Sequence, residues 1–173
     1  MHRATFRHLM ADPLDAALKV ALLAAVVAGA TAGGALWASP NPPQDSEGIP
    51  ASALMKPEEL VELLQEPAKT KPRVIFVGFR ALYVQAHIPG SEYAGPASRE
   101  ESIQQLQKLL QSAPGKKLIV LYCGCCPWSH CPNVLPAYKA ARAMGFTQLK
   151  VLYIPLDFGR DWMAKGYPVQ TGN

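Results

Sequence analysis

The stretch from Lys117 to Tyr122 constrains the fold more than any other part of the sequence. After the lysine it reads Leu-Ile-Val-Leu-Tyr, an unbroken apolar run, and Pro114-Gly115 lies just before it. A short continuous run of this kind is typical of a parallel strand that is buried on both faces. Cys123 follows directly, at the carboxyl end of the strand, where reactive groups gather in parallel sheets.

The surrounding sequence alternates between strand and helix patterns. We expect strands at Arg73–Val77 and Leu149–Ile154, on either side of the Lys117–Tyr122 strand in the chain. Helices are expected from Pro57 with Glu58 and Glu59 in its first turn, from a Ser98–Glu101 capping box to Pro114-Gly115, at Val134–Met144, and at Asp157–Lys165. Alternating elements of this kind predict an α/β domain with a central, mostly parallel sheet flanked by helices.

The N-terminal part has a different character. Residues 20–38 carry no charged side chain, which is about the length of helix that spans a bilayer. Basic residues precede this run and acidic residues follow it, which predicts a cytoplasmic leader at 1–19 and a transmembrane anchor at 20–38. Residues 39–50 form a Pro-rich linker, and the domain occupies 51–173. The domain would then lie in the periplasm or elsewhere outside the cytoplasm. The alternative is a cleaved signal peptide and a secreted domain.

The overall charge gives little sign of a nucleic-acid partner. The formal net charge is +4, and 17% of residues are charged. The basic residues are spread over different predicted elements and form no stripe with interleaved aromatic residues, so no nucleic acid is expected. No cofactor is expected either.

All four cysteines of the chain lie between Cys123 and Cys131, in the sequence CGCCPWSHC. Backbone N–H groups converge where a strand turns into a helix, so we expect them to lower the pKa of Cys123 and favour its thiolate. His130 could add a positive charge or accept the thiol proton. Three uses of the cluster stay open: covalent sulfur chemistry, a disulfide, or a metal site formed by Cys123, Cys125, Cys126, His130 and Cys131.

Several segments, in order, resemble the rhodanese-like sulfurtransferases. They are Lys56–Leu60, Val77–Arg80, His-Ile-Pro-Gly-Ser at His87–Ser91, Ile119–Cys123, Ala143–Phe146 and Trp162–Val169. The resemblance covers about residues 50 to 172 and implies the rhodanese-like fold. It further implies that Cys123 takes sulfane sulfur from a donor, holds it as a persulfide and passes it to a thiol acceptor.

The resemblance gives the nucleophile, and the extra cysteines of this loop, where the family needs one, add candidates around it. Cys123 is the catalytic candidate; Cys125, Cys126, His130 and Cys131 are candidates for resolving or modulating it; Arg80, Gly124, Trp128 and Ser129 are candidates for the loop and substrate pocket. The usual family loop ends in an arginine that helps bind anionic donors, and this longer loop contains none. Ser129 stands where related phosphatases need that arginine. The alternative function is a non-catalytic module that binds a metal ion or a partner protein through the cysteines.

Overall fold

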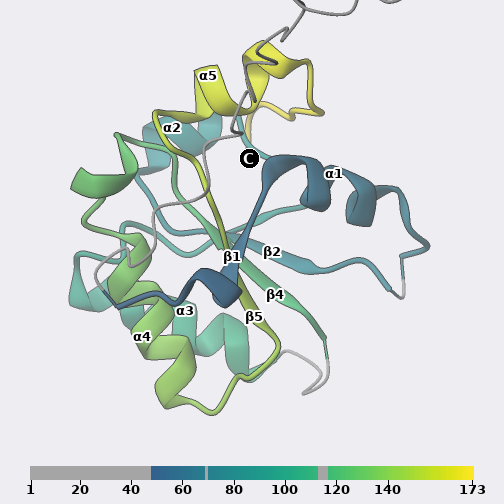
Figure 1. The fold of residues 1–173 in the computed structure, drawn as a ribbon. Helices are drawn as coiled ribbons and strands as arrows, with labels where there is room; N and C mark the ends of the chain where they lie inside the picture. Colours follow the sequence, from purple (N-terminus) through teal and green to yellow (C-terminus); the bar gives the residue numbers. More distant parts are fainter. Residues whose placement is uncertain (1–47, 69, 113–116) are drawn as a thin grey trace, which may run out of the picture. The chain divides into compact units, whose positions relative to one another are not determined.

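The computed structural model describes residues 48–68, 70–112 and 117–173. Its sheet has five strands in the order β1-β5-β4-β2-β3, and each neighbouring pair is parallel. The strands are β1 Leu54–Met55, β2 Arg73–Phe76, β3 Glu92–Tyr93, β4 Ile119–Tyr122 and β5 Leu149–Leu152. The helices are α1 Pro57–Gln65, α2 Arg80–Gln85, α3 Glu100–Gln111, α4 Val134–Ala143 and α5 Phe158–Asp161 (Figure 1). The predicted α/β architecture is confirmed.

β4 is the central strand, and all four of its side chains are fully buried. Successive side chains of a strand point to opposite faces of the sheet. Ile119 and Leu121 therefore pack with α3 and α4, while Val120 and Tyr122 pack with α1, α2 and α5. Full burial of an aliphatic or aromatic side chain contributes about 1.5–3 kcal/mol, so this strand anchors both halves of the core.

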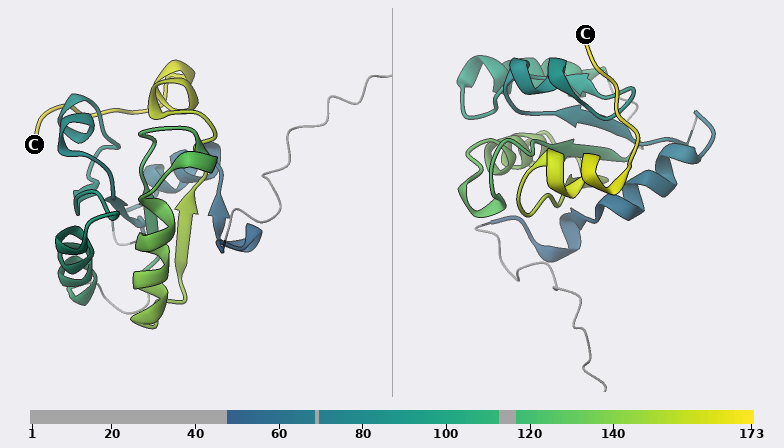
Figure 2. Two further views of the ribbon diagram at one scale, coloured as in Figure 1. Left: turned by 90° about the vertical axis from the view of Figure 1, so that its left-hand side faces the viewer. Right: turned by 90° about the horizontal axis from the view of Figure 1, so that it is seen from above.

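Helices cover both faces of the sheet, as the two views of Figure 2 show. α3 and α4 form the layer on one face, and α1, α2 and α5 with Trp162 form the layer on the other. By the alternation along β4, Cys123 continues the face that packs with α3 and α4. The nucleophile candidate therefore points toward the start of α4.

The helix beginning at Pro57 is confirmed, with proline at its first position and Glu58 and Glu59 in its first turn. The Glu59 side chain accepts a hydrogen bond from the backbone N–H of Lys56 at 3.1 Å. The predicted capping box at Ser98 is wrong. α3 begins at Glu100, after an Arg99 that makes no side-chain cap. The Ser98 N–H donates to Asn133 Oδ1 at 3.0 Å, so a tertiary contact takes the place of the local one.

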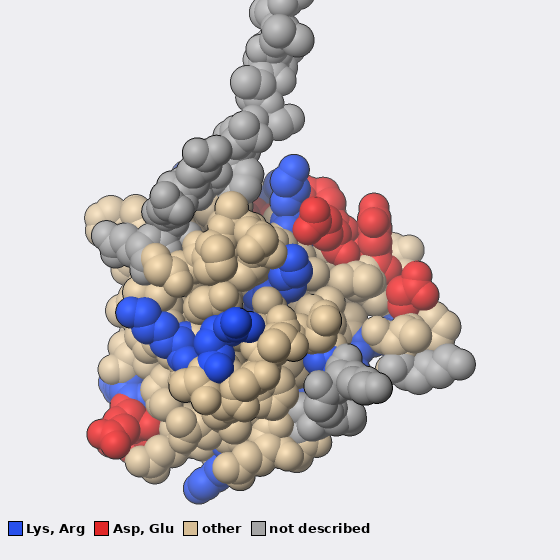
Figure 3. All heavy atoms as spheres, turned by 60° about the horizontal axis from the view of Figure 1, so that its bottom comes forward, with Lys and Arg blue, Asp and Glu red and all other residues tan. Residues whose placement is uncertain are grey.

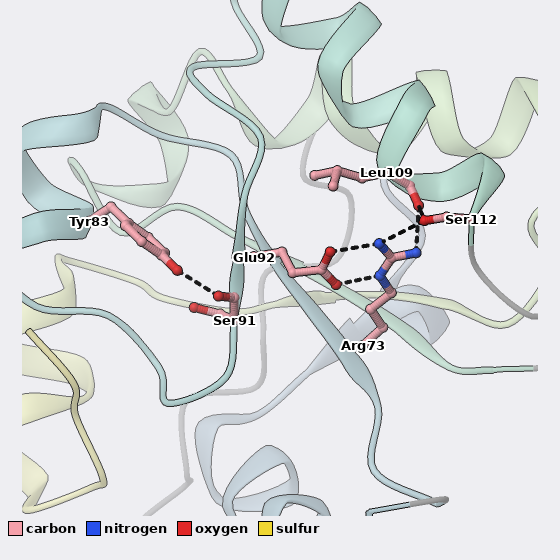
Figure 4. Close-up of polar contacts among 6 residues, drawn as sticks. All are labelled: Arg73, Tyr83, Ser91, Glu92, Leu109 and Ser112. Carbon is pink, nitrogen blue, oxygen red and sulfur yellow. Dashed lines mark hydrogen bonds and ion pairs between the residues drawn. The ribbon is translucent and has the colours of Figure 1, made fainter. Parts of the chain in front are cut away.

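Several elements are shorter than expected or absent from the sequence prediction. The expected final helix is two pieces, α5 and a 3-10 helix at Met163–Lys165, although Asp157 does cap α5 by accepting the Arg160 N–H at 2.8 Å. β1 and β3 have only two residues each, too few to show a period in the sequence. Figure 4 shows how Glu92 of β3 is held: its carboxylate pairs with Arg73, which also bonds Ser112 at the end of α3.

The predicted leader, the span at 20–38 and nearly all of the linker lie outside the described residues. Within the part of the chain that the structure describes, no helix is long and apolar enough to cross a membrane. On the face drawn in Figure 3, the lysine and arginine side chains stand in small groups among uncharged residues, and acidic side chains lie in two places, at the upper right and at the lower left.

Candidate active site

Cys123 lies directly after β4, and its side chain is only 2% exposed. Gly124 turns the chain there with a φ of 74°, a conformation that favours glycine. A Cβ at Gly124 would also lie 2.9 Å from Phe158 Cβ. The carbonyl of Gly124 accepts a hydrogen bond from the Phe158 N–H at 3.1 Å, which ties the turn to α5.

Gly78 is a site residue that the sequence did not reveal as one. A Cβ at this position would lie 2.9 Å from Cys123 Sγ and 2.7 Å from Phe76 Cζ. The space that a side chain would need is therefore filled by the sulfur of Cys123. The sequence showed only a glycine within the Val77–Arg80 segment, a small residue shortly after a strand. Its contact with Cys123 follows from the pairing of β2 with β4, which the sequence does not give.

We call Cys123–Asn133 the thiol loop. Its four cysteines are free thiols, all within the described residues. The Sγ atoms of Cys123, Cys125 and Cys131 all lie within 4.8 Å of one another. Cys126 stands outside this trio: its Sγ is 3.1 Å from Cys125 Sγ and donates to the His130 carbonyl at 3.6 Å. Three of the four predicted thiols are thus brought together, and the fourth lies at the edge.

Asn133 connects the trio to the start of α4. Its side chain is completely buried, and its Nδ2 donates to Cys123 Sγ at 3.5 Å and to Cys125 Sγ at 3.8 Å. Its Oδ1 accepts the Ser98 N–H, so both ends of the amide are engaged. The sequence prediction missed this role. An asparagine before a helix suggests an N-cap, yet here the side chain makes no cap and binds the sulfurs instead.

The thiols differ in how their proton is held. Hydrogen bonds from the thiols of Cys123 and Cys125, and from the backbone N–H groups of Asn133 and Val134, lower the pKa of Cys131. A hydrogen bond from Cys125 lowers the pKa of Cys123, but the interaction with Cys131 and burial outweigh it, and the pKa of Cys123 rises. The prediction of a lowered pKa at Cys123 is therefore wrong. The helix start stabilises a thiolate at Cys131, which lies closer to it in the chain.

The other two thiols are also held in the neutral form. Hydrogen bonding to Cys123 and then to Cys131 raises the pKa of Cys125, with burial adding to the rise. Burial raises the pKa of Cys126, and the neighbouring Cys125 adds to this. The cluster thus favours one negative charge, at Cys131, shared through hydrogen bonds with Cys123 and Cys125.

A pocket of about 270 Å³ opens beside Cys123. Its lining comes from the end of β2, α2, the thiol loop and α5: Phe76, Leu82, Gln85, Ala86, Cys123, Gly124, Cys125, Asp157, Phe158, Gly159 and Met163. Most of this wall is apolar, and its only charged member among the described residues is Asp157. Cys131 does not line it, so the third thiol of the trio approaches Cys123 from a different side, that of α4.

The remaining predicted pocket residues, apart from Gly124, lie elsewhere. The Trp128 ring packs edge-on against Tyr153 with ring centroids 5.1 Å apart, and the backbone N–H of Trp128 donates to the Pro155 carbonyl at 3.0 Å. Ser129 and His130 are exposed and bond each other, Oγ to Nδ1, at 2.9 Å. Arg80 is exposed, bonds Asn173 and places its guanidinium 4.9 Å above the Tyr93 ring. These side chains surround the site without lining the pocket beside Cys123.

We call His87–Ser91 the bracing segment. His87 is buried, its Nδ1 lies 2.7 Å from the Tyr83 carbonyl, and its ring stacks on Tyr83 at 3.9 Å. Its backbone pairs in both directions with Gln170. The Tyr122 hydroxyl accepts the Ile88 N–H and bonds Ser91 Oγ, each at 3.0 Å. Tyr83 donates to the Ser91 carbonyl at 2.6 Å, as Figure 4 shows. The segment is thus structural and fixes the residue just before Cys123.

The trio of thiols is also the part of the site that could hold a metal ion. Its Cys123, Cys125 and Cys131 sulfurs are soft ligands suited to cuprous ion or zinc. Of the five ligands proposed from the sequence, Cys126 and His130 do not join the group of mutually close ligand atoms found among the described residues. The geometry thus reduces the metal alternative to three sulfur ligands.

Comparison with known proteins places the fold. No protein-family model matches the sequence, and no curated protein is a significant match. Among solved structures, the BH2092 protein from Bacillus halodurans is 18% identical with a TM-score of 0.53, over 69% of this chain and 77% of that one. The Alr3790 protein from Anabaena is 21% identical with a TM-score of 0.51, over 68% of this chain and 82% of that one.

The Anabaena protein has also been solved in solution. A solution structure of the same Alr3790 protein is described as a rhodanese-like domain, and it is 20% identical to this chain with a TM-score of 0.49, over 69% of this chain and 79% of that one. At these identities the likeness concerns the fold. The parallel sheet and the helices on both of its faces agree with it. The described residues therefore have a rhodanese-like fold.

Proposed function

We propose that this domain transfers sulfane sulfur, carried as a persulfide on Cys123, from a donor to a thiol acceptor. The observation that supports this most directly is the position of Cys123 Sγ. It lies at the carboxyl end of the central strand and forms part of the wall of a pocket of about 270 Å³. Because the side chain is 2% exposed, a donor reaches the sulfur through this pocket.

The pocket wall suggests the kind of donor. Phe76, Leu82, Phe158 and Met163 give it an apolar surface, and Asp157 is the only charged residue among its described lining. An inorganic dianion such as thiosulfate would meet no cation there and one carboxylate of its own sign. A small-molecule or protein persulfide, whose sulfane sulfur is carried on an organic group, fits this wall better.

The reaction is a thiol exchange at sulfur. Cys123 Sγ attacks the outer sulfur of a donor R–S–SH, the donor S–S bond breaks, and R–SH leaves, so that Cys123–S–SH is formed. The proton of Cys123 passes to the leaving thiolate, which departs as R–SH. The backbone N–H of Cys125 and the amide of Asn133 donate to the sulfur and stabilise its negative charge. An acceptor thiol then takes the outer sulfur and restores Cys123.

The test is sulfur loading of the full chain. The reduced protein is treated anaerobically with one equivalent of glutathione persulfide, quenched with an alkylating agent, and mapped by mass spectrometry. We expect a gain of one sulfur atom on Cys123, before any later step, and no such adduct in Cys123→Ser. Cys126→Ser is the matched control, since that thiol stands outside the trio. Absence of any sulfur adduct in the wild type and in a variant that lacks the three other thiols would contradict the proposal.

The trio also favours one competing function, the binding of a soft metal ion. Titration of the reduced chain with cuprous ion or zinc, followed by sulfur loading, separates the two. Tight stoichiometric binding together with failure to load the metal-free protein would favour the metal-binding module. Loading of the metal-free protein at Cys123 favours sulfur transfer.

A further inference from the structure

Cys125 and Cys131 both lie next to Cys123, but on different sides of it. Cys125 lines the pocket beside Cys123, which is where the outer sulfur of a persulfide would be placed. Cys131 does not line the pocket and lies at the start of α4, within 4.8 Å of Cys123 Sγ. The two neighbouring thiols therefore face different atoms of a persulfide on Cys123.

This difference decides what each thiol can do. Exchange at sulfur proceeds with the attacking and leaving sulfurs roughly in line through the sulfur that is attacked, and the outcome depends on which sulfur that is. Attack by Cys125 on the outer sulfur would only move the persulfide along the loop. Attack by Cys131 on the inner sulfur, from the side away from the pocket, would expel the outer sulfur into the pocket.

We infer that Cys131 resolves the Cys123 persulfide, so that the site reduces sulfane sulfur to hydrogen sulfide and stores the oxidation as a Cys123–Cys131 disulfide. This inference rests on the proposed function, because it requires the persulfide. The step is Cys123–S–SH plus the Cys131 thiolate giving Cys123–S–S–Cys131 and HS⁻. One S–S bond breaks and another forms, the sulfane sulfur gains two electrons, and the two protein sulfurs are oxidised together. An external dithiol restores the reduced site by ordinary exchange.

The loop has the groups that this step needs. The backbone N–H groups of Asn133 and Val134 face Cys131 Sγ and stabilise its negative charge before attack. Asn133 Nδ2 donates to Cys123 Sγ, the atom under attack, and holds it beside Cys131. Closing the bridge joins residues on either side of Trp128, within the one connection between β4 and α4. The longer span makes this disulfide easier to form than one between Cys123 and Cys125.

The experiment is a single turnover of the full chain. The reduced protein receives one equivalent of glutathione persulfide without other thiols, and both free sulfide and protein mass are followed. We expect the wild type to release sulfide in proportion to the protein, to lose two hydrogens, and to yield a Cys123–Cys131 cross-linked peptide. Because this cross-linked peptide is detected in the wild-type protein, the result does not depend on whether a variant folds.

The variants separate the two neighbours. Cys131→Ser should keep the extra sulfur on Cys123 and lose the sulfide release, although Cys125 is still present in it. Cys126→Ser, whose thiol stands outside the trio, should still release sulfide. A stable persulfide in the wild type, or sulfide release retained in Cys131→Ser, would overturn the inference and leave the proposed function standing. No sulfur adduct in any variant would instead refute the proposed function, and the inference with it.

Discussion

The bracing segment and the thiol loop both contact the end of β4, but they differ in how their polar groups are paired. In the bracing segment the polar groups are paired: Tyr122 accepts from Ile88 and bonds Ser91, and His87 bonds Tyr83 and Gln170. In the thiol loop, one residue later, three sulfurs lie within 4.8 Å of one another, and two of them, those of Cys123 and Cys125, share the side-chain amide of Asn133. Tyr122 therefore stabilises the end of β4 on one face of the sheet, and Cys123, the next residue, carries the reactive sulfur on the other face.

The difference shows how a reactive site can tolerate clustered thiols. A satisfied polar network in a low-dielectric interior is rigid, whereas sulfur is a weak donor and acceptor that loses little when its partners change. The bracing segment holds the end of β4 in place. The thiol loop can then exchange protons and sulfur among its members without disturbing the sheet.

The largest expected effect concerns reactivity within the thiol loop. Alkylation of the reduced chain at about pH 6 should modify Cys131 well before Cys123, because the pKa of Cys131 is lowered and that of Cys123 is raised. Raising the pH toward the ordinary range of thiols should narrow the difference, since the buried thiols begin to ionise. Pulse labelling with iodoacetamide and peptide mapping measures the order. Labelling of Cys123 before Cys131 would contradict the expected difference in pKa between these two cysteines.

The next effect follows from the close approach at Gly78. Gly78→Ala should cost about 1–3 kcal/mol of unfolding free energy, because the new methyl group meets Phe76 and the Cys123 sulfur. It should also slow sulfur loading of Cys123 by displacing that sulfur from its place beside the pocket. Urea unfolding and the loading assay measure the two effects. Unchanged loading at reduced stability would show that the position of the sulfur is less constrained than its contacts indicate.

In the bracing segment we expect loss of stability without loss of chemistry. Tyr122→Phe removes the acceptor of the buried Ile88 N–H, which should cost about 1–2 kcal/mol. Loading of Cys123 should persist, because phenylalanine keeps the ring that packs against Phe76 and Phe158 of the pocket wall. Tyr167→Phe is the matched control, since that hydroxyl bonds Glu58 at the surface. A loss of loading comparable to that of Cys123→Ser would show that the two regions are not separable.

The smallest effect is expected at Arg80. Its side chain is exposed, so Arg80→Gln should change the unfolding free energy by about 0.5 kcal/mol through the lost contact with the Tyr93 ring. Sulfur loading should be unaffected, because Arg80 does not line the pocket. A large drop in loading would mean that the residue acts on the donor before it enters the pocket.

Sequence reasoning succeeded where one segment alone carried the information. The buried strand β4, the helix beginning at Pro57 and the position of Cys123 at a strand end are all predicted from short local sequence patterns. It failed where distant segments meet. The side chain of Asn133 does not cap α4, because its Oδ1 accepts the N–H of Ser98 from a distant part of the chain. Gly78 contacts Cys123 because β2 pairs with β4. The two-residue strands β1 and β3 have no pattern of their own and are formed by their neighbours.

The indole of Trp128 lies between Cys126 and Cys131 in the thiol loop and against Tyr153, 5.1 Å away. Its backbone is fastened to Pro155, while Gly124 at the other end of the loop is fastened to Phe158. Any bridge between Cys123 and Cys131 must pull on a loop that is fixed at these two points. The domain therefore carries a fluorophore inside its reactive loop, with the fully buried Trp162 as an internal reference. Its emission can report the oxidation state of the site without an added label.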